Sequence, residues 1–382
     1  MRDPRPDDAA ADPAAVRFLK KNRGNLFPLL LAAFLMLSGF SGTEAQTAEE
    51  TGVSALLEAE ELLTEEEKAG DVPIDLASKL ERILSSGGLA AAQNASAHLA
   101  ALLGVLLLSS LLRAVGELSR SEGLRAMCDY ATLLAVSGVT YSVFGSLFRL
   151  AGEALNALTA YMAALLPVTG AVLTAGGTPT AAATSAAAFS LFLSCVSLLS
   201  SSVLFPFLQV SFSLCFAGAV PGAVDLSPIA SLVKNTAAVL LAFLYTTLGF
   251  LVGLQSTVSA AADGYVFRTV KFASGVFIPV VGGMLGDAAR TVAGGIAVIR
   301  GTVGTVGVVA TLAVLLPPML VLIAHRFVLS LCASLAKMLG CAREGQMLSD
   351  LGGVAGLLFG TVAGAEAVTV LYLACFIRTS AL

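Results

Sequence analysis

The chain is poor in charge, contains no tryptophan and has only two histidines. Charged residues make up 13% of its 382 residues, whereas typical soluble domains carry about 25%. The net charge of −4 gives no reason to expect a nucleic-acid partner. Without tryptophan, any aromatic belt at a membrane surface has to be built from tyrosine and phenylalanine.

The motifs of common enzymes and metal sites are also missing. The sequence has no G-x-x-x-x-G-K-[ST], G-x-S-x-G or H-E-x-x-H segment, so ATP hydrolysis by this chain is not expected. Its six cysteines are scattered, mostly within apolar runs and with no C-x-x-C pair, which favours buried thiols. His98 and His325 are far apart and are expected near the ends of membrane spans. We therefore predict a protein that is not an enzyme, with no cofactor and no metal.

Apolar sequence is what the chain has in abundance. Apolar residues make up 57% of the chain, and the mean hydropathy is +0.87. Runs of about 20 apolar residues can cross a bilayer. We place six of them at 97–112, 131–148, 181–204, 236–254, 303–323 and 352–377. Three further apolar blocks are broken by Pro or Gly and either span, re-enter or lie at the interface: 156–176, 204–222 and 272–286. The predicted fold is an all-α, polytopic integral-membrane bundle with broken or re-entrant helices.

The N-terminal region is expected to leave the cytoplasm. Residues 1–45 are predicted to be a signal peptide, because basic residues precede an apolar run and small residues end at Ala45. An uncleaved anchor helix is the alternative. Residues 46–96 are predicted to form a short extracytoplasmic helical segment, in which Gly87 could end a helix. The alternative is an acidic, solvated lead-in. Residues 97–382 form the predicted multi-span membrane domain.

The first span is expected to run from outside to inside. Arg113, Arg120 and Arg125 follow it closely, and cytoplasmic loops carry an excess of Lys and Arg. Beyond this loop, the distribution of charge does not decide the topology, because the broken blocks can either span or re-enter.

A weak internal repeat is indicated by two broken segments. Pro167-Val168-Thr169-Gly170 resembles Pro279-Val280-Val281-Gly282, 112 residues further on. The possible repeat halves are about 131–235 and 236–345. Broken segments at corresponding positions point to a central site in transporters, so we predict helix breaks at Pro167, Gly170, Pro279 and Gly282, close together in space. The alternative is chance similarity between sequences rich in small apolar residues.

A charged cluster surrounds the second of these breaks. Asp263, Arg268, Lys271 and Asp287 lie in the stretch 262–288 between long runs with almost no charge. Ionisable groups beside irregular backbone in a membrane protein are a functional-site hypothesis. We predict that they line a pathway or dock a partner. The alternative is that they snorkel at the membrane surface and anchor the topology.

The same stretch carries a family resemblance. The residues involved are Ala262-Asp263-Gly264, Arg268-Thr269, Lys271-Phe272-Ala273, Gly275, Phe277-Ile278-Pro279-Val280-Val281-Gly282, Met284 and Asp287-Ala288. This pattern resembles the signature of the stage III sporulation protein AE family. The resemblance covers most of 97–377 and is sharpest over 255–305.

The resemblance implies a location, a set of partners and a function. Such proteins belong to endospore-forming bacteria and sit in the mother-cell membrane that surrounds the forespore, as multi-pass cell-membrane proteins. Their expected partners are membrane lipid and the other stage III sporulation A-operon proteins, including an ATPase and ring-forming subunits, and indirectly a forespore channel protein. The implied function is that of an integral-membrane subunit of a secretion-like sporulation channel, needed for late forespore development. The alternative function is a secondary transporter or permease with its site at the Pro/Gly-broken helices, and a passive scaffold is a third.

Overall fold

The structure is a computed structural model of the 382-residue chain. It describes residues 76–118, 122–220, 227–277 and 282–378. For some helical residues, among them 255–277 and 282–294, it describes only the backbone. The predicted signal peptide and most of the predicted extracytoplasmic segment lie outside the described residues.

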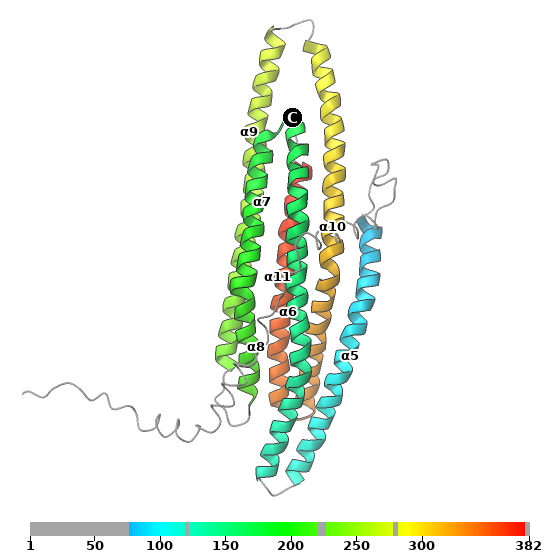
Figure 1. The fold of residues 1–382 in the computed structure, drawn as a ribbon, viewed down its shortest axis with the longest axis vertical. Coiled ribbons are helices and arrows are strands. Elements are labelled where there is room, and N and C mark those ends of the chain that lie inside the picture. The colour runs from blue at the N-terminus through cyan, green and yellow to red at the C-terminus, as the bar shows by residue number, and fades with distance from the viewer. Residues whose placement is uncertain (1–75, 119–121, 221–226, 278–281, 379–382) are drawn as a thin grey trace, which may run out of the picture.

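The described chain is a bundle of long helices (Figure 1). In chain order these are α5 (Leu76–Leu118), α6 (Glu122–Ala175), α7 (Pro179–Leu199), the π-helix η1 (Ser200–Leu204), α8 (Phe205–Ala219), α9 (Ser227–Phe277), α10 (Gly282–Met338) and α11 (Ala342–Arg378). No strand occurs in the part of the chain that the structure describes. The all-α polytopic fold predicted from the sequence is confirmed.

Six of these helical rods are long and apolar enough to cross a membrane, counting α7, η1 and α8 as one rod. Each contains one of the six predicted apolar runs. A membrane-spanning chain has to satisfy its backbone hydrogen bonds internally, and long helices achieve this within one segment. The chain is therefore a multi-pass membrane protein.

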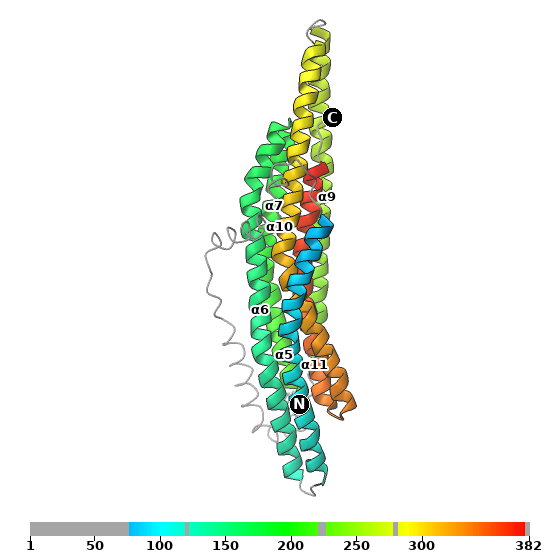
Figure 2. The same cartoon turned by 90° about the vertical axis from the view of Figure 1, so that its right-hand side faces the viewer.

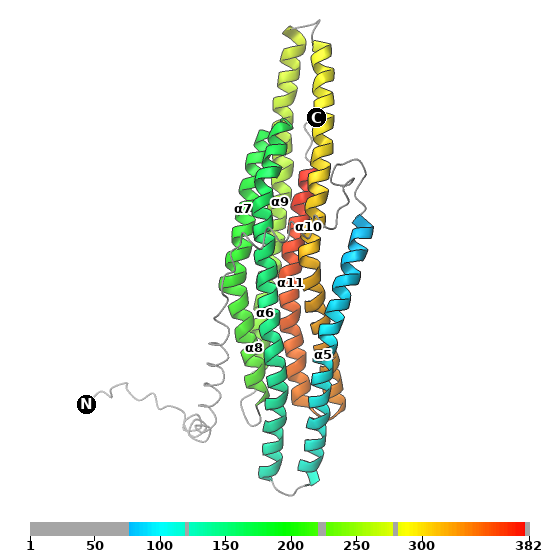
Figure 3. The ribbon, with the colours of Figure 1, turned by 45° about the vertical axis from the view of Figure 1, so that its right-hand side comes forward.

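The helices are much longer than a bilayer is thick. α6 has 54 residues and α10 has 57, so each is about 80–85 Å long at 1.5 Å per residue. The hydrocarbon core of a bilayer is about 30 Å thick. At one end the last turns of α5 and the first turns of α6 extend beyond the other helices, and at the opposite end the last turns of α9 and the first turns of α10 do so (Figures 1 and 3).

The core takes side chains from all the long helices and contains a cluster of aromatic rings. The ring of Phe212 on α8 lies 4.9 Å from that of Phe144 on α6 and 4.7 Å from that of Phe216. Phe189 on α7 stacks on Tyr372 of α11 at 4.0 Å. Lipid is as apolar as these side chains, so close packing holds the helices together here more than the hydrophobic effect does.

The predicted helix break at Pro167 and Gly170 is wrong. α6 continues through both residues and ends at Ala175. Proline removes one backbone donor, but neighbouring helices and Ser/Thr side chains can compensate within a membrane bundle. Here the Thr169 hydroxyl donates to the Leu166 carbonyl at 2.9 Å and lies 3.2 Å from the Tyr372 hydroxyl of α11.

The predicted re-entrant segments are not found in the described residues. Block 156–176 is the second half of α6, and most of block 204–222 is α8. The residues between the predicted run 131–148 and block 156–176 are an uninterrupted part of α6. The irregularity of the bundle is instead η1, where the Ser200-Ser201-Ser202 run has π-helical geometry between α7 and α8. Pro279 lies outside the described residues, and Gly282 is the first residue of α10.

Two helix connections share one turn geometry. Gly177, between α6 and α7, and Gly340, between α10 and α11, have φ angles of 76° and 81°, which favour glycine. The next residue in each turn donates its N–H back across the turn, Thr178 to the Leu173 carbonyl and Cys341 to the Ala336 carbonyl. Both turns are therefore Schellman caps.

These turns lie at corresponding places in two three-helix units, each between the second and third helix of its unit. The first is α5, α6 and α7–α8, and the second is α9, α10 and α11. Colour and labels in Figures 1 and 3 show that α5 and α9 run in opposite directions along the bundle. The packing does not follow the same symmetry, since α5 lies on α10 whereas α9 lies on α7, α8 and α11. The proposed repeat with its 112-residue offset stays a prediction.

The boundary predicted after residue 96 is not marked by a break in the helix. α5 is continuous from Leu76 to Leu118 and passes through Gly87, which was expected to end a helix. A Cβ atom on Gly87 would lie 3.4 Å from Leu320 and 3.6 Å from Pro317. Gly87 therefore allows α5 to pack closely against α10.

Candidate functional sites in the bundle

The charged cluster predicted from the sequence belongs to the projecting α9–α10 hairpin. Asp263, Arg268 and Lys271 lie on the last part of α9, and Asp287 lies on the first turns of α10. In the described residues, the candidate spans of these helices end at Leu254 and begin at Gly295. The four side chains lie outside the described residues, so their convergence stays a prediction.

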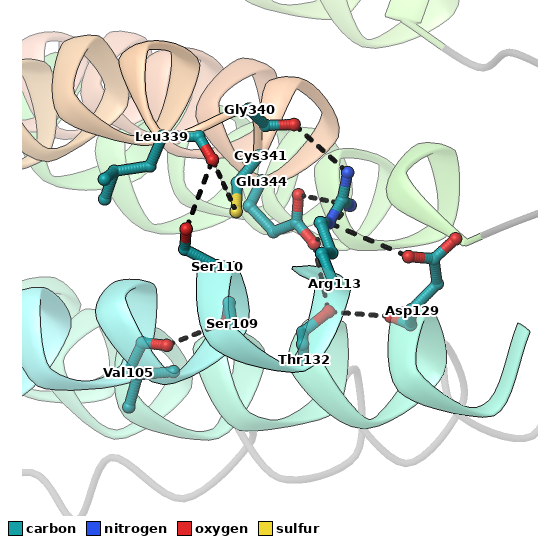
Figure 4. A network of polar contacts seen from close by, with 10 residues as sticks. All are labelled: Val105, Ser109, Ser110, Arg113, Asp129, Thr132, Leu339, Gly340, Cys341 and Glu344. Carbon is teal, nitrogen blue, oxygen red and sulfur yellow. Dashed lines mark hydrogen bonds and ion pairs between the residues drawn. The ribbon is translucent and has the colours of Figure 1, made fainter. Parts of the chain in front are cut away.

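A polar clamp joins α5, α6 and α11 at the other end of the bundle (Figure 4). The Arg113 guanidinium donates from Nη2 to both carboxylate oxygens of Glu344, at 2.9 and 3.0 Å. The Thr132 hydroxyl lies 3.1 Å from Glu344 Oε1, and Arg113 Nε lies 3.7 Å from an Asp129 oxygen. Glu344 is 1% exposed. Removing one partner of a buried ion pair leaves an uncompensated charge. The clamp therefore holds α5, α6 and α11 in their relative positions.

The same clamp holds the α10–α11 turn. Arg113 Nη1 donates to the Gly340 carbonyl at 3.2 Å, and the Ser110 hydroxyl donates to the Leu339 carbonyl at 3.4 Å. Cys341, the residue after the left-handed glycine, is fully buried. Burial raises the pKa of the Cys341 thiol, and the nearby Glu344 carboxylate raises it further. Cys341 is therefore a neutral packing residue and not a reactive thiol.

An ion pair links α9 to α11. Lys234 Nζ contacts the Asp350 carboxylate, and both side chains are largely buried. The Gln346 amide donates to the other Asp350 oxygen at 3.2 Å. The aliphatic part of Lys234 runs along Gly353, where an added Cβ would lie 3.4 Å away. The pair fixes the position of α9 relative to α11.

His98 and His325, which are far apart in the sequence, are neighbours in the structure. Both are 5% exposed, and their ring centroids are 5.5 Å apart, between α5 and α10. His325 Nδ1 lies 2.8 Å from the Val321 carbonyl. Neither ring nitrogen of His98 has a hydrogen-bond partner among the described residues. α5 packs on α10 and buries both rings, and the expectation that they lie near the membrane interface stays a prediction.

Two further charged residues are buried within the spans. Glu366 on α11 is 5% exposed, and neither carboxylate oxygen is hydrogen-bonded within the described part of the chain. Thr311 of α10 lies nearby, but its hydroxyl donates to the Val308 carbonyl. Arg300 on α10 places its guanidinium against Gly176, beside the C-terminal end of α6, where the helix dipole favours a positive charge.

Comparison with known proteins assigns the chain to a family. The profile of stage III sporulation protein AE matches residues 57–380. The chain belongs to the stage III sporulation protein AE family. The stage III sporulation protein AE of Bacillus subtilis strain 168 is 28% identical over 190 residues, which are 50% of this chain and 48% of that protein. The alignment thus spans about half of that curated relative. No solved structure matches the chain.

The family match covers every polar site described above. In this member of the stage III sporulation protein AE family, the clamp brings together Arg113 and Glu344, which are 231 positions apart in the sequence. From the sequence, Arg113 was assigned only to a positively charged loop, and Glu344 was not singled out. The available signal was Glu344 itself, an acidic residue one turn into an apolar helix, since charges in such segments are rare and need a partner.

A metal centre is not found in the part of the chain that the structure describes. No three His, Cys, Asp or Glu side chains gather to hold an ion within those residues. Beside His98 and His325, the described residues therefore offer no third side chain that could bind a metal ion. The absence of a cofactor stays an expectation from the sequence.

Proposed function

We propose that this chain is an integral-membrane subunit of the sporulation channel between mother cell and forespore, a secretion-like complex needed for late forespore development. Family membership implies a role in sporulation. The observation that carries the proposal is the family match over 57–380 together with six candidate spans in the same region. In this proposal the chain is not an enzyme and resides in the mother-cell membrane that surrounds the forespore.

The bundle offers a different surface to partners on each side of the membrane. If the start of α5 is extracytoplasmic, the α9–α10 hairpin is extracytoplasmic too, because both lie away from the α5–α6 end (Figures 1 and 3). That hairpin carries Asp263, Arg268, Lys271 and Asp287. We assign it to docking of ring-forming subunits, and the α5–α6 end to contacts with the cytoplasmic ATPase.

The hairpin charges provide the test of this proposal. Asp263→Asn, Arg268→Ala and Asp287→Asn are expected to leave the protein level in membranes unchanged but to block spore formation after engulfment. Arg268→Lys should also impair sporulation, because a planar guanidinium and a compact ammonium are not interchangeable where a partner is docked.

Sporulation efficiency and immunoblots of membrane fractions are measured together. Glu81→Gln, which removes an exposed charge at the start of α5 and outside both assigned docking surfaces, is the control and should sporulate normally. Normal sporulation in all four hairpin variants would contradict the docking assignment. Loss of the protein itself would show that these residues serve folding.

A permease is the second candidate function, favoured by Glu366. An intramembrane carboxylate without a bonded partner among the described residues is typical of ion and proton pathways. The feature that first suggested a permease, a helix break at Pro167, is not found. We therefore rank the channel subunit first.

A further inference from the structure

The exposed face of α6 differs from that of α9. Between Leu134 and Val168, no large apolar side chain of α6 is exposed. α9 exposes large apolar side chains throughout the part whose side chains are described, among them Ile229, Phe243 and Phe250. Such side chains suit contact with lipid tails, and α6 lacks them over about 50 Å of its length.

A polar stripe occupies the middle of this face. The exposed residues are Ser142, Ser146, Arg149, Glu153 and Asn156, and their spacing of three and four places them on one side of the helix. The Arg149 and Glu153 side chains are 67% and 58% exposed and 3.6 Å apart. Small residues continue the face on both sides, with Gly138 before the stripe and Ala163 after it.

The position of the bilayer along α6 does not remove the difficulty. The stretch of α6 before residue 135 and the stretch after residue 164 are each under 20 residues long. Both are therefore shorter than a bilayer core, which needs about 20 residues of helix. Wherever the membrane lies, part of the face between 135 and 164, which lacks exposed large apolar side chains, has to cross it. Against lipid, the Arg149 and Glu153 side chains would be costly, whereas a second protein surface can pair them.

We propose that the polar stripe of α6, residues 142–156, is the contact between two copies of this chain in the membrane. α6 lies at the front of the bundle in Figure 1, where no described helix covers it. The stripe carries one charge of each sign, four residues apart, so it complements itself. Copies in one membrane share an orientation, and a two-fold axis along the membrane normal sets Arg149 of each copy against Glu153 of the other. The offset of about 6 Å along the helix is within reach of an arginine.

The small residues make the close approach possible. Gly138, Ser142 and Ser146 follow one another at intervals of four, the small-xxx-small pattern that lets membrane helices approach closely. A Cβ added to Gly138 meets no atom within 4 Å in the single chain. The surface around Gly138 is therefore open in one copy, and a bulky side chain there should disturb only an association between copies.

Photo-crosslinking in native membranes tests the proposal. A benzoylphenylalanine residue is placed at Ser146 in the full-length chain and, as a matched control, at Phe243, which is exposed on α9. We expect a crosslinked band of twice the chain's mass from Ser146, at least five-fold stronger than from Phe243. A chain that stays monomeric with the probe at Ser146, or a crosslink to a different protein, would overturn the proposal.

Charge reversal separates pairing between copies from pairing within one helix. Arg149→Glu and Glu153→Arg copies carry different tags and are expressed alone or together. Each variant alone should lose at least five-fold of the Ser146 crosslink. The mixture should restore it, because the two carboxylates of the Arg149→Glu copy then face the two guanidinium groups of the Glu153→Arg copy. A mixture that stays uncrosslinked contradicts the proposal.

Gly138→Leu keeps the test decisive if a charge variant is not inserted. It should abolish the Ser146 crosslink at an unchanged protein level. A Ser146 crosslink of full strength in this variant would contradict the proposal. All outcomes are independent of the sporulation assay, so failure here leaves the proposed channel role untouched.

Discussion

Two carboxylates of α11 are buried in different ways. Glu344 is bonded by Arg113 and Thr132, whereas Glu366 has no hydrogen bond within the described residues. Removing a carboxylate that is bonded to a buried partner leaves that partner uncompensated, whereas a carboxylate without partners has no such contact to lose. The two residues should therefore respond differently to the same substitution.

Glu344→Ala is expected to destabilise the bundle by about 2–3 kcal/mol. This is below the roughly 3–5 kcal/mol typical of a broken buried pair, because Arg113 is partly exposed and keeps Asp129 and the Gly340 carbonyl nearby. Glu344→Gln, which retains an acceptor oxygen, should lose less. Thermal unfolding of the purified protein in detergent measures the difference. Equal midpoints for the wild type and Glu344→Ala would show that the clamp is not a stabilising contact.

Glu366→Gln is expected to leave membrane insertion and protein level intact, because the amide matches the carboxyl in size and adds no charge to the span. Glu366→Lys places a charge in the span and should lower the level, since such a charge costs about 2.5–3.5 kcal/mol even on the lenient insertion scale. Immunoblots of membrane fractions check both variants. Sporulation adds a second readout: normal levels with no spores in Glu366→Gln would favour the permease over the channel subunit.

At the scale of elements, glycines on α11 set the distances between helices. Gly364 faces the ring of Tyr245 on α9, and Gly356 faces the Arg326 guanidinium on α10. The Tyr245 hydroxyl donates to the Thr361 carbonyl at 2.7 Å. The Tyr245 ring thus lies directly against Gly364, in space that a side chain at position 364 would occupy.

Gly364→Ala should therefore separate α9 from α11. The new methyl group collides with the Tyr245 ring, and overpacking of this kind typically costs about 1–3 kcal/mol. Gly104→Ala on α5 is the matched control, because its Cβ meets no atom within 4 Å and alanine favours helix by up to about 1 kcal/mol. Thermal unfolding in detergent compares the two variants. If both unfold at the wild-type temperature, α9 and α11 are not held by this contact.

At the scale of the whole molecule, the direction in which each helix runs along the bundle determines on which side of the membrane its two ends lie, relative to the ends of α5. An extracytoplasmic reporter fused near residue 90 should be active, and one fused near residue 120 silent. The structure extends this prediction: a fusion near 280 should be active and one near 340 silent. The end of α9 and the start of α10 lie at the end of the bundle opposite to the end of α5 and the start of α6, whereas α10 ends and α11 begins toward the same end as these (Figure 2). Activity at 120 or 340 would invert the topology.

Much of the fold was predictable because its cause is local. The six apolar runs predicted six spans, and each run lies in a separate rod. The outcome at Pro167 was not predictable in this way. Proline predicts a break from local backbone chemistry, but α6 continues through it because neighbouring helices support a proline helix inside a membrane bundle.

The sequence by itself determined the class of the protein, since a chain with 57% apolar residues and 13% charge can satisfy its backbone in a membrane only as helices or a closed barrel. It also carried the family signature. Only the tertiary structure decided which polar groups meet: Arg113 with Glu344 across 231 positions, Lys234 with Asp350 across 116, and His98 with His325. Helical periodicity reports the neighbours within one helix, and these contacts depend on how separate helices pack.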